Sequence, residues 1–333
     1  PGGKGVAMTQ PVLEIDNLSV QFNLKRGVLR AIDQISFEIG KGETFGLVGE
    51  SGSGKSVTAR AIMRLIPSPP GEIATGTVRF QGRDLYQMPD KEIREIRGQN
   101  IAMVFQEPMN ALNPVFTVGS QIGDALRTNM GMSKQEARER TIEMLQLVGI
   151  PSPNDRVDNY VHEFSGGMRQ RVMLAMALSC DPTFLIADEP TTALDVTIQA
   201  VILELITSMI ERFDMSLLFI THNLGVVAHA CDKIGVMYAS HIVEVGTKEE
   251  IFANPQHPYT VGLLRSIPRL DVQSKFLTPI DGTVCNMMEP PPGCKFNPRC
   301  SHAMDICRER IPEFKELSPG HFAACHLHDQ PTV

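Results

Sequence analysis

The 333-residue sequence contains no run of about 18 or more consecutive apolar residues, the length that a helix needs to cross a bilayer. Internal repeats and low-complexity tracts are also missing, so the sequence lacks the signatures of solenoids and of repetitive disordered chains. Hydrophobic residues make up 42% and charged residues 21% of the chain. This composition is ordinary for a globular protein, and we expect a packed core of normal size.

The sequence also lacks net positive charge, because its formal net charge at pH 7 is −7. A nucleic acid is held mainly by cationic side chains that neutralise its phosphates, so we expect no nucleic-acid partner. Residues 1–7 lack the apolar core of a signal peptide. We interpret them as the remnant of a tag ahead of a natural start at Met8, and we expect the protein to stay in the cytoplasm.

Short segments that are apolar or alternate between apolar and polar residues predict strands. They cover residues 12–20, 35–39, 44–48, 101–105, 184–187, 217–221 and 234–237. Helical patterns lie between them, at about residues 55–65 and in the segment that begins with a capping box of Ser133 and Glu136 and stops at Gly149. Strands that alternate with helices predict an α/β fold with a mostly parallel sheet.

Two changes along the chain predict its organisation. Residues from about 108 to 179 have few strand signals, so we expect a helical insert there. After Leu270 the composition shifts to proline, cysteine and histidine without sustained periodicity. We therefore expect one domain over residues 8–270 and a cysteine-rich tail over residues 271–333.

A phosphate-binding loop is predicted at Gly49-Glu-Ser51-Gly52-Ser-Gly54-Lys55-Ser56, between a predicted strand and a predicted helix. Its glycines let backbone N–H groups converge on phosphate oxygens, where the positive end of the helix dipole adds attraction. Lys55 is expected to reach the β- and γ-phosphates, and the Ser56 hydroxyl to help hold Mg²⁺. The pattern thus predicts a bound nucleotide, ATP with Mg²⁺.

Two adjacent carboxylates follow a second buried strand, in Phe184-Leu-Ile-Ala-Asp188-Glu189. Side chains alternate along a strand, so these neighbours are expected to point to different sides of it. Asp188 can then serve the metal ion, while Glu189 faces the γ-phosphate as the general base for water. Alone the pair would indicate only a loop start, but beside a phosphate loop it indicates hydrolysis.

The segment Phe164-Ser165-Gly166-Gly167-Met168-Arg169-Gln170-Arg171 resembles the signature motif of ATP-binding-cassette proteins. Ser165 suits a helix N-cap, and two glycines leave N–H groups bare at the helix start, where an anion can bind. The family's other elements follow in its order, as the Q-loop Gln106, the D-loop Ala193-Leu194-Asp195 and the switch histidine His222. Phe22 matches the aromatic residue that stacks on adenine.

The resemblance implies a fold and a set of roles. The fold is a P-loop ATPase domain with a mostly parallel sheet, an antiparallel β subdomain and a helical subdomain. Glu189, His222 and Gln106 would be catalytic, with Gln106 also at Mg²⁺. Met168 stands where the commonest signature has glutamine. This change leaves Ser165 and both glycines in place, so phosphate contact should survive without the contacts of the amide.

Three further segments look like those of dipeptide and oligopeptide importer ATPases, and they begin at Phe105, Asn254 and Pro292. By similarity, two ATPase subunits face each other, each ATP lying between one phosphate loop and the partner's signature. The partner would be a paralogue or a second copy. Two integral membrane permease subunits and, indirectly, an extracytoplasmic binding protein would complete the importer. The expected location is the cytoplasmic face of the cell membrane, as a peripheral subunit.

The seven cysteines are unevenly spread, and five lie between Cys285 and Cys325. In a reducing cytoplasm such a cluster indicates a metal site rather than disulfides. The spacing of the last four is not that of a zinc ribbon, and four thiolates from a proline-rich segment suit a [4Fe–4S] cluster. The proposed ligands are Cys294, Cys300, Cys307 and Cys325.

The resemblance to cluster-bearing tails of some peptide-importer ATPases selects iron, which spacing alone does not. A zinc site that uses His321, His326 or His328 stays open, as do unliganded thiols and Cys285 as a substitute ligand. The cargo is open too, because relatives of this kind handle dipeptides, longer peptides, glutathione or nickel chelates. The rival functions are a soluble cassette ATPase outside transport and an iron–sulfur protein that only senses ATP.

Overall fold

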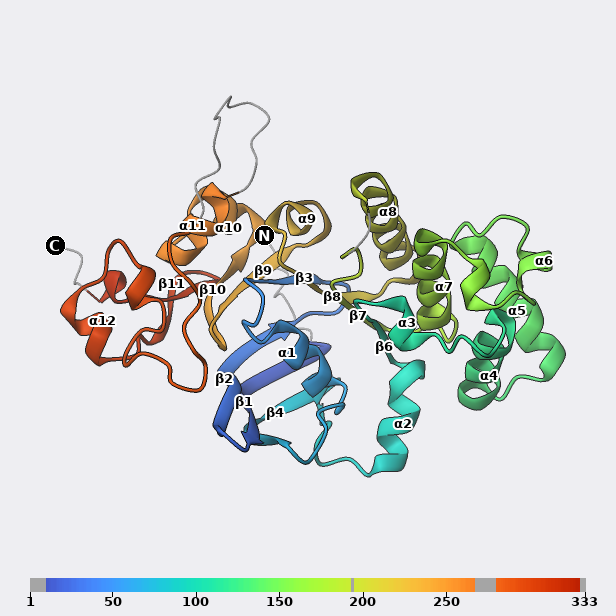
Figure 1. The fold of residues 1–333 in the computed structure, drawn as a ribbon, viewed down its shortest axis with the longest axis horizontal. Helices are drawn as coiled ribbons and strands as arrows, with labels where there is room; N and C mark the ends of the chain where they lie inside the picture. The colour runs from blue at the N-terminus through green and yellow to red at the C-terminus, as the bar shows by residue number, and fades with distance from the viewer. Residues whose placement is uncertain (1–9, 193–194, 267–279, 330–333) are drawn as a thin grey trace, which may run out of the picture. The chain divides into compact units, whose positions relative to one another are not determined.

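The computed structural model describes residues 10–192, 195–266 and 280–329 (Figure 1). The chain splits into two compact units, one formed by Pro1–Tyr86 with Ile220–Val333 and the other by Gln87–Phe219. The predicted tag remnant and the predicted boundary near residue 270 lie outside the described residues. The division into domains therefore stays a prediction.

The first unit contains a four-stranded antiparallel sheet in the order β2-β1-β4-β5, drawn in blue and cyan in Figure 1. Buried Leu13 and Ile15 alternate with the more exposed Glu14 and Asp16 along β1, so one face of that strand packs into the core. This is the antiparallel β subdomain implied by the resemblance. Its strands are β1 (Leu13–Leu24), β2 (Gly27–Ile39), β4 (Gly71–Phe80) and β5 (Arg83–Asp84).

A second sheet in this unit begins with a parallel pair, β3 (Thr44–Val48) and β9 (Lys233–Tyr238). Both strands are almost wholly buried, as expected for parallel strands covered on both faces. β10 (His241–Thr247) pairs antiparallel with β9. The helices of the unit are α1 (Lys55–Ile62), α9 (Leu224–Ala230), α10 (Lys248–Ala253) and α11 (Pro258–Arg265).

The C-terminal segment extends this sheet, which the sequence did not predict. β12 (His321–Ala324) pairs antiparallel with β10, and β11 (Phe314–Ser318) pairs with β12. Both strands are short and β11 is mostly exposed, so neither gives a clear apolar pattern. The segment also contains α12 (Asp305–Glu309) and two single-turn 3₁₀ helices, Asn297–Arg299 and His326–His328.

A buried carboxylate fastens the hairpin to the sheet. Glu244 on β10 is fully buried, and its carboxylate accepts hydrogen bonds from His321 Nε2 at 2.8 Å and from the backbone N–H groups of Gln256 and His257 at 2.7 and 2.9 Å. A buried carboxylate is costly unless its oxygens are paired, so these bonds are required for the segment to pack here.

We predict that His321→Ala lowers the free energy of unfolding by about 3 kcal/mol, because it leaves the buried Glu244 carboxylate short of a partner. Chemical denaturation followed by circular dichroism measures the change. His302→Ala is the matched control, since His302 lies in the same segment but is exposed. Equal stability of the two variants would contradict this role of His321.

The second unit contains the parallel pair β6 (Ile101–Val104) and β7 (Phe184–Asp188) and a set of helices. The predicted capping box of Ser133 and Glu136 is confirmed at the start of α5, whose buried face includes Ala137 and Met144. Helices also fill the region predicted as the helical insert. They are α3 (Pro108–Ala111), α4 (Val118–Met130), α5 (Lys134–Leu147), α6 (Pro153–Arg156), a 3₁₀ turn (Val161–Glu163) and α7 (Gly166–Leu178). Outside that region the unit also contains α2 (Asp90–Gln99) and α8 (Val196–Phe213).

β8 (Ser216–Thr221) leads the chain out of the second unit and back into the first. Across the described ranges, none of the helices combines the length and the apolar character that a bilayer crossing demands. The parallel pairs and the helices between them confirm the predicted α/β class.

Candidate functional site

The predicted phosphate loop lies between β3 and α1, as expected. Gly49 and Gly54 have φ values of +157° and +113°. A Cβ atom at Gly49 would stand 2.0 Å from the carbonyl oxygen of Met237, and one at Gly54 would stand 2.5 Å from that of Ala31. Only glycine fits at these two positions, because the backbone of the loop runs against neighbouring strands.

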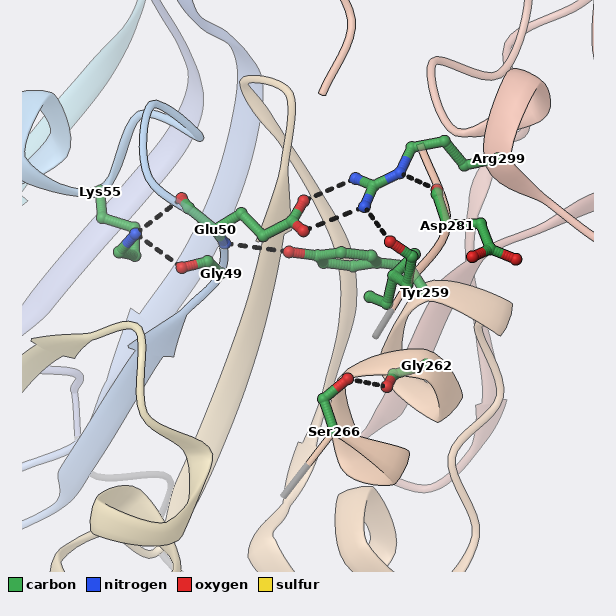
Figure 2. A network of polar contacts seen from close by, with 9 residues as sticks. Gly49, Glu50, Lys55, Tyr259, Gly262, Ser266, Asp281 and Arg299 are labelled. Atoms are coloured by element: carbon green, nitrogen blue, oxygen red, sulfur yellow. Dashed lines mark hydrogen bonds and ion pairs between the residues drawn. The ribbon is translucent and has the colours of Figure 1, made fainter. Parts of the chain in front are cut away.

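Lys55 is the first residue of α1 and is 4% exposed. Its ammonium group donates to the carbonyl oxygens of Gly49 at 2.8 Å and Glu50 at 2.9 Å (Figure 2). The first turn of α1 has no acidic residue, so nothing in that turn offsets the positive end of the helix dipole. The loop therefore joins a fixed cation to a helix start, an arrangement that favours a phosphate anion.

The other predicted residues of the first unit lie on separate elements. Phe22 is half-buried on β1, where it pairs with Leu29 and Gly71. His222 is exposed directly after β8. Ser51 and Gly52 are exposed at the loop, and Ser56 follows Lys55 on α1.

In the second unit the structure brings Gln106 and Glu189 together. Gln106 Nε2 donates to Glu189 Oε2 at 3.2 Å, and the Thr192 hydroxyl donates to the same oxygen at 2.8 Å. Asp188 ends β7 and is 4% exposed, whereas Glu189 is half-buried with φ at 47°. A glutamate in the left-handed region is strained, and such strain gathers at functional sites.

The signature segment begins α7. Ser165 is its N-cap, and the Ser165 hydroxyl accepts from the Met168 N–H at 3.4 Å. Ser165 and Gly166 are exposed, and a Cβ at Gly166 would meet no atom within 4 Å. Asp195 similarly caps α8 by accepting from the Ile198 N–H at 3.0 Å, while Ala193 and Leu194 lie outside the described residues. Ser165 thus caps α7 as predicted, and the capping of α8 by Asp195 is an addition from the structure.

The four predicted cluster ligands lie close enough to influence one another electrostatically. Burial and the neighbouring thiols of Cys294, Cys300 and Cys307 together raise the pKa of Cys325 to about 11. Burial, together with Cys307 and Cys300, likewise raises the pKa of Cys294 to about 11. Burial also raises the pKa of Cys285, but this thiol faces the cations Lys295 and Arg299.

Within the described part of the chain, no three histidine, cysteine, aspartate or glutamate side chains have the geometry that holds a single metal ion. The [4Fe–4S] cluster therefore stays a prediction.

Sequence reasoning missed the contacts of Glu50, the second residue of the phosphate loop. The Glu50 carboxylate binds Arg299, and its backbone N–H donates to the Tyr259 hydroxyl at 2.9 Å (Figure 2). Both partners lie more than 200 positions away along the chain. A lone arginine and a lone tyrosine carry no local pattern that indicates such contacts.

Comparison with protein families gives two matches. Residues 32–192 match the family described as "ABC transporter", and residues 243–307 match "Oligopeptide/dipeptide transporter, C-terminal region". The chain is 51% identical to the dipeptide transport ATP-binding protein DppD of Bacillus subtilis, over 96% of both chains. It is 51% identical to the oligopeptide transport ATP-binding protein OppD of the same organism, over 95% of this chain and 88% of that one. DppD of Haemophilus influenzae is 47% identical, over 95% of each.

Solved structures give the same architecture. The dimeric post-hydrolysis structure of the ATP-binding cassette MJ0796, bound to ADP and phosphate, has a TM-score of 0.64 and 25% identity, covering 71% of this chain and 98% of that one. The cbiO1 protein from Clostridium perfringens has a TM-score of 0.62 and 26% identity, covering 76% and 95%. These structures span less of this chain than the sequence relatives do.

Proposed function

Because the chain belongs to the ATP-binding-cassette family of ATPases, among the dipeptide and oligopeptide transport ATP-binding proteins, we propose that it hydrolyses ATP to drive peptide import as the nucleotide-binding subunit of a membrane transporter. The observation that carries this proposal is 51% identity over 96% of both chains to a dipeptide transport ATP-binding protein. The match includes the C-terminal region, so it extends beyond the ATPase motifs.

ATP binding is assigned to the phosphate loop and Phe22. The backbone N–H groups of Gly49, Ser51, Gly52 and Gly54 and the ammonium of Lys55 would hold the phosphates, and Phe22 would stack on adenine. Mg²⁺ is assigned to the Ser56 hydroxyl and Gln106, with Asp188 serving the same ion. Two observations support the assignment. The loop has a backbone conformation that only glycine can adopt at Gly49 and Gly54, and the buried ammonium of Lys55 lies beside it.

Hydrolysis is assigned to Glu189, Gln106 and His222. Glu189 would accept a proton from a water molecule as the water oxygen attacks the γ-phosphorus, and ADP would leave. Gln106 hydrogen-bonds to the Glu189 carboxylate and would orient it, and His222 would stabilise charge on the γ-phosphate. The left-handed backbone at Glu189 supports a functional role for this residue.

The signature is assigned to the ATP held by a second ATPase subunit, either a paralogue or another copy of this chain. Ser165, Gly166 and Gly167 would receive its phosphates, with Asp195 at the same interface. Ser165 and Gly166 are exposed at the start of α7, as a site completed by another molecule requires. The cassette MJ0796 was solved as a dimer, which supports this assembly.

Transport also requires two integral membrane permease subunits and, outside the cell, a binding protein that delivers cargo. This subunit would sit peripherally on the cytoplasmic face of the membrane. Val115 and Phe116, which follow the Q-loop residue Gln106 in the second unit, are 70% and 54% exposed. An apolar surface of this kind favours a protein partner over water.

The proposal is tested by purifying the chain from the membranes of its own cells in mild detergent. We expect two integral membrane subunits to co-purify, and proteoliposomes of the complex with its binding protein to take up radiolabelled dipeptide only with ATP. Uptake of glutathione or a nickel chelate instead would keep the motor and change the cargo. An ATPase that co-purifies with no membrane subunit would favour a cassette ATPase outside transport.

The tail is assigned to a [4Fe–4S] cluster held by Cys294, Cys300, Cys307 and Cys325. The mutual electrostatic influence of their thiols supports this set over one that includes Cys285. When bound, the cluster supplies a cationic iron for each thiolate and thereby an organising centre for a segment with little apolar core.

A further inference from the structure

Glu50 is held at three points, by its near neighbour Lys55 and by two residues from distant parts of the chain. Its backbone N–H donates to the Tyr259 hydroxyl at 2.9 Å, and its carbonyl oxygen accepts from Lys55 Nζ at 2.9 Å. Its carboxylate receives two bonds from the Arg299 guanidinium, at 2.6 and 3.1 Å. In Figure 2, Arg299 and Tyr259 reach Glu50 from one side and Lys55 reaches it from the other.

Arg299 is itself immobilised. Its side chain is 4% exposed, and its remaining donors bind the carbonyl oxygens of Asp281 at 2.9 Å and Ile280 at 3.2 Å. The guanidinium also lies 5.8 Å from the ring centre of Tyr238 and 6.0 Å from that of Phe296. The bidentate ion pair therefore fixes the position of the Glu50 carboxylate and also neutralises its charge, because Arg299 itself is held in place.

Tyr259 is equally fixed. It is fully buried on α11, with its ring 4.6 Å from Tyr238 and 5.4 Å from Phe296, centre to centre. Its hydroxyl therefore presents an acceptor to the Glu50 N–H from a rigid aromatic group.

We propose that Arg299 and Tyr259 are positioning residues for the phosphate loop, through which the C-terminal segment sets the affinity of the protein for ATP. The proposal rests on the assignment of ATP to this loop. Two physical effects support it. The contacts of Arg299 and Tyr259, here called the tether, keep Glu50 in one conformation, and with it the carbonyl oxygen that accepts from Lys55. If the loop adopted its binding conformation only part of the time, its affinity for ATP would fall in proportion to that fraction. Arg299 also neutralises a carboxylate that would otherwise repel the phosphates.

The first test measures MgATP affinity by calorimetry and steady-state ATPase kinetics. Arg299→Gln should raise the Kd and the KM about tenfold, with kcat near that of the parent protein. Tyr259→Phe, which keeps the packed ring, should raise both about threefold because the Glu50 N–H loses its acceptor. A variant that was only partly folded would instead lower kcat at an unchanged KM.

A double-mutant cycle tests whether Arg299 acts through Glu50. In a Glu50→Gln background the repelling carboxylate is gone, so Arg299→Gln should cost less than about threefold in affinity. If Arg299→Gln lowers the affinity for MgATP by the same factor in both backgrounds, the proposal is overturned. MgATP binding equal to that of the parent in both Arg299→Gln and Tyr259→Phe would overturn it as well.

Two further variants separate this proposal from its premise. Arg308→Gln is the matched control, since Arg308 also adjoins a cysteine in the same segment, but its ion pair with Asp305 is exposed at 64% and 97%. It should bind MgATP normally, and a loss equal to that of Arg299→Gln would overturn the specific tether. Lys55→Ala should nearly abolish binding. If Lys55→Ala binds as the parent does, the phosphate-loop assignment itself fails, whatever Arg299 does.

Discussion

The Glu189→Gln variant should bind ATP as tightly as the parent protein and hydrolyse it on the order of 10²–10⁴-fold more slowly. The amide keeps the size of the side chain but cannot accept a proton from the attacking water. It can still take part in hydrogen bonds with Gln106 and Thr192, so the loop around it should stay in place. Because each ATP is proposed to lie between two subunits, ATP that is bound but not hydrolysed should also make the variant accumulate as an ATP-bound dimer.

Calorimetry with MgATP, phosphate release and size-exclusion chromatography with ATP measure these three outcomes. Glu211→Gln is the matched control, because Glu211 is exposed near the end of α8 in the same unit. Full activity in Glu189→Gln would mean that Glu189 is not the general base. The base would then be His222 or the γ-phosphate of ATP itself. Loss of ATP binding in the same variant would mean that the carboxylate serves the nucleotide rather than the water.

The cysteine-rich segment should give the second large effect. Protein purified without oxygen should be brown and contain iron and acid-labile sulfide, and serine at any one of the four proposed ligands should bleach it. Burial raises the pKa of Cys294 and Cys325 to about 11, so these thiols keep their protons at neutral pH unless a metal displaces them. Iron loading should therefore release protons.

Cys285→Ser is the matched control and should leave the colour unchanged, because Cys285 faces Lys295 and Arg299. Metal analysis, sulfide assay and absorbance spectra check each variant. Stoichiometric zinc without iron or sulfide would mean that the segment binds a structural zinc ion and no cluster. Loss of colour in Cys285→Ser, with colour kept in one of the other four, would mean that the ligand set is wrong.

The parts that the sequence predicts well are encoded in neighbouring residues. The glycines of the phosphate loop, the capping box of Ser133 and Glu136, and the buried strand that ends at Asp188 each depend on chemistry within about eight positions. The same holds for Ser165, which caps α7 as its position before two glycines suggests. Such features can be interpreted before any tertiary contact is known.

The parts that escaped prediction are pairings between remote positions. Glu50 and Arg299 are 249 positions apart, and Glu244 and His321 are 77 apart. Each is a single polar residue in a segment without periodicity, so nothing local indicates a partner. The hairpin of β11 and β12 was missed for a related reason, because strands of five and four residues show too few buried positions to reveal an alternation.

The first unit is assembled from both ends of the chain, with residues 87–219 between them. A ribosome adds roughly 5–20 residues per second. On the order of ten seconds therefore pass between the synthesis of β3 and α1 and the synthesis of β9. During that time the edges of β3 have no β9 to pair with. The middle unit is complete by then, so it should fold first, and the nascent N-terminal segment should be the part that depends on chaperones. Pulse proteolysis of stalled nascent chains should find residues 87–219 protected before residues 13–86.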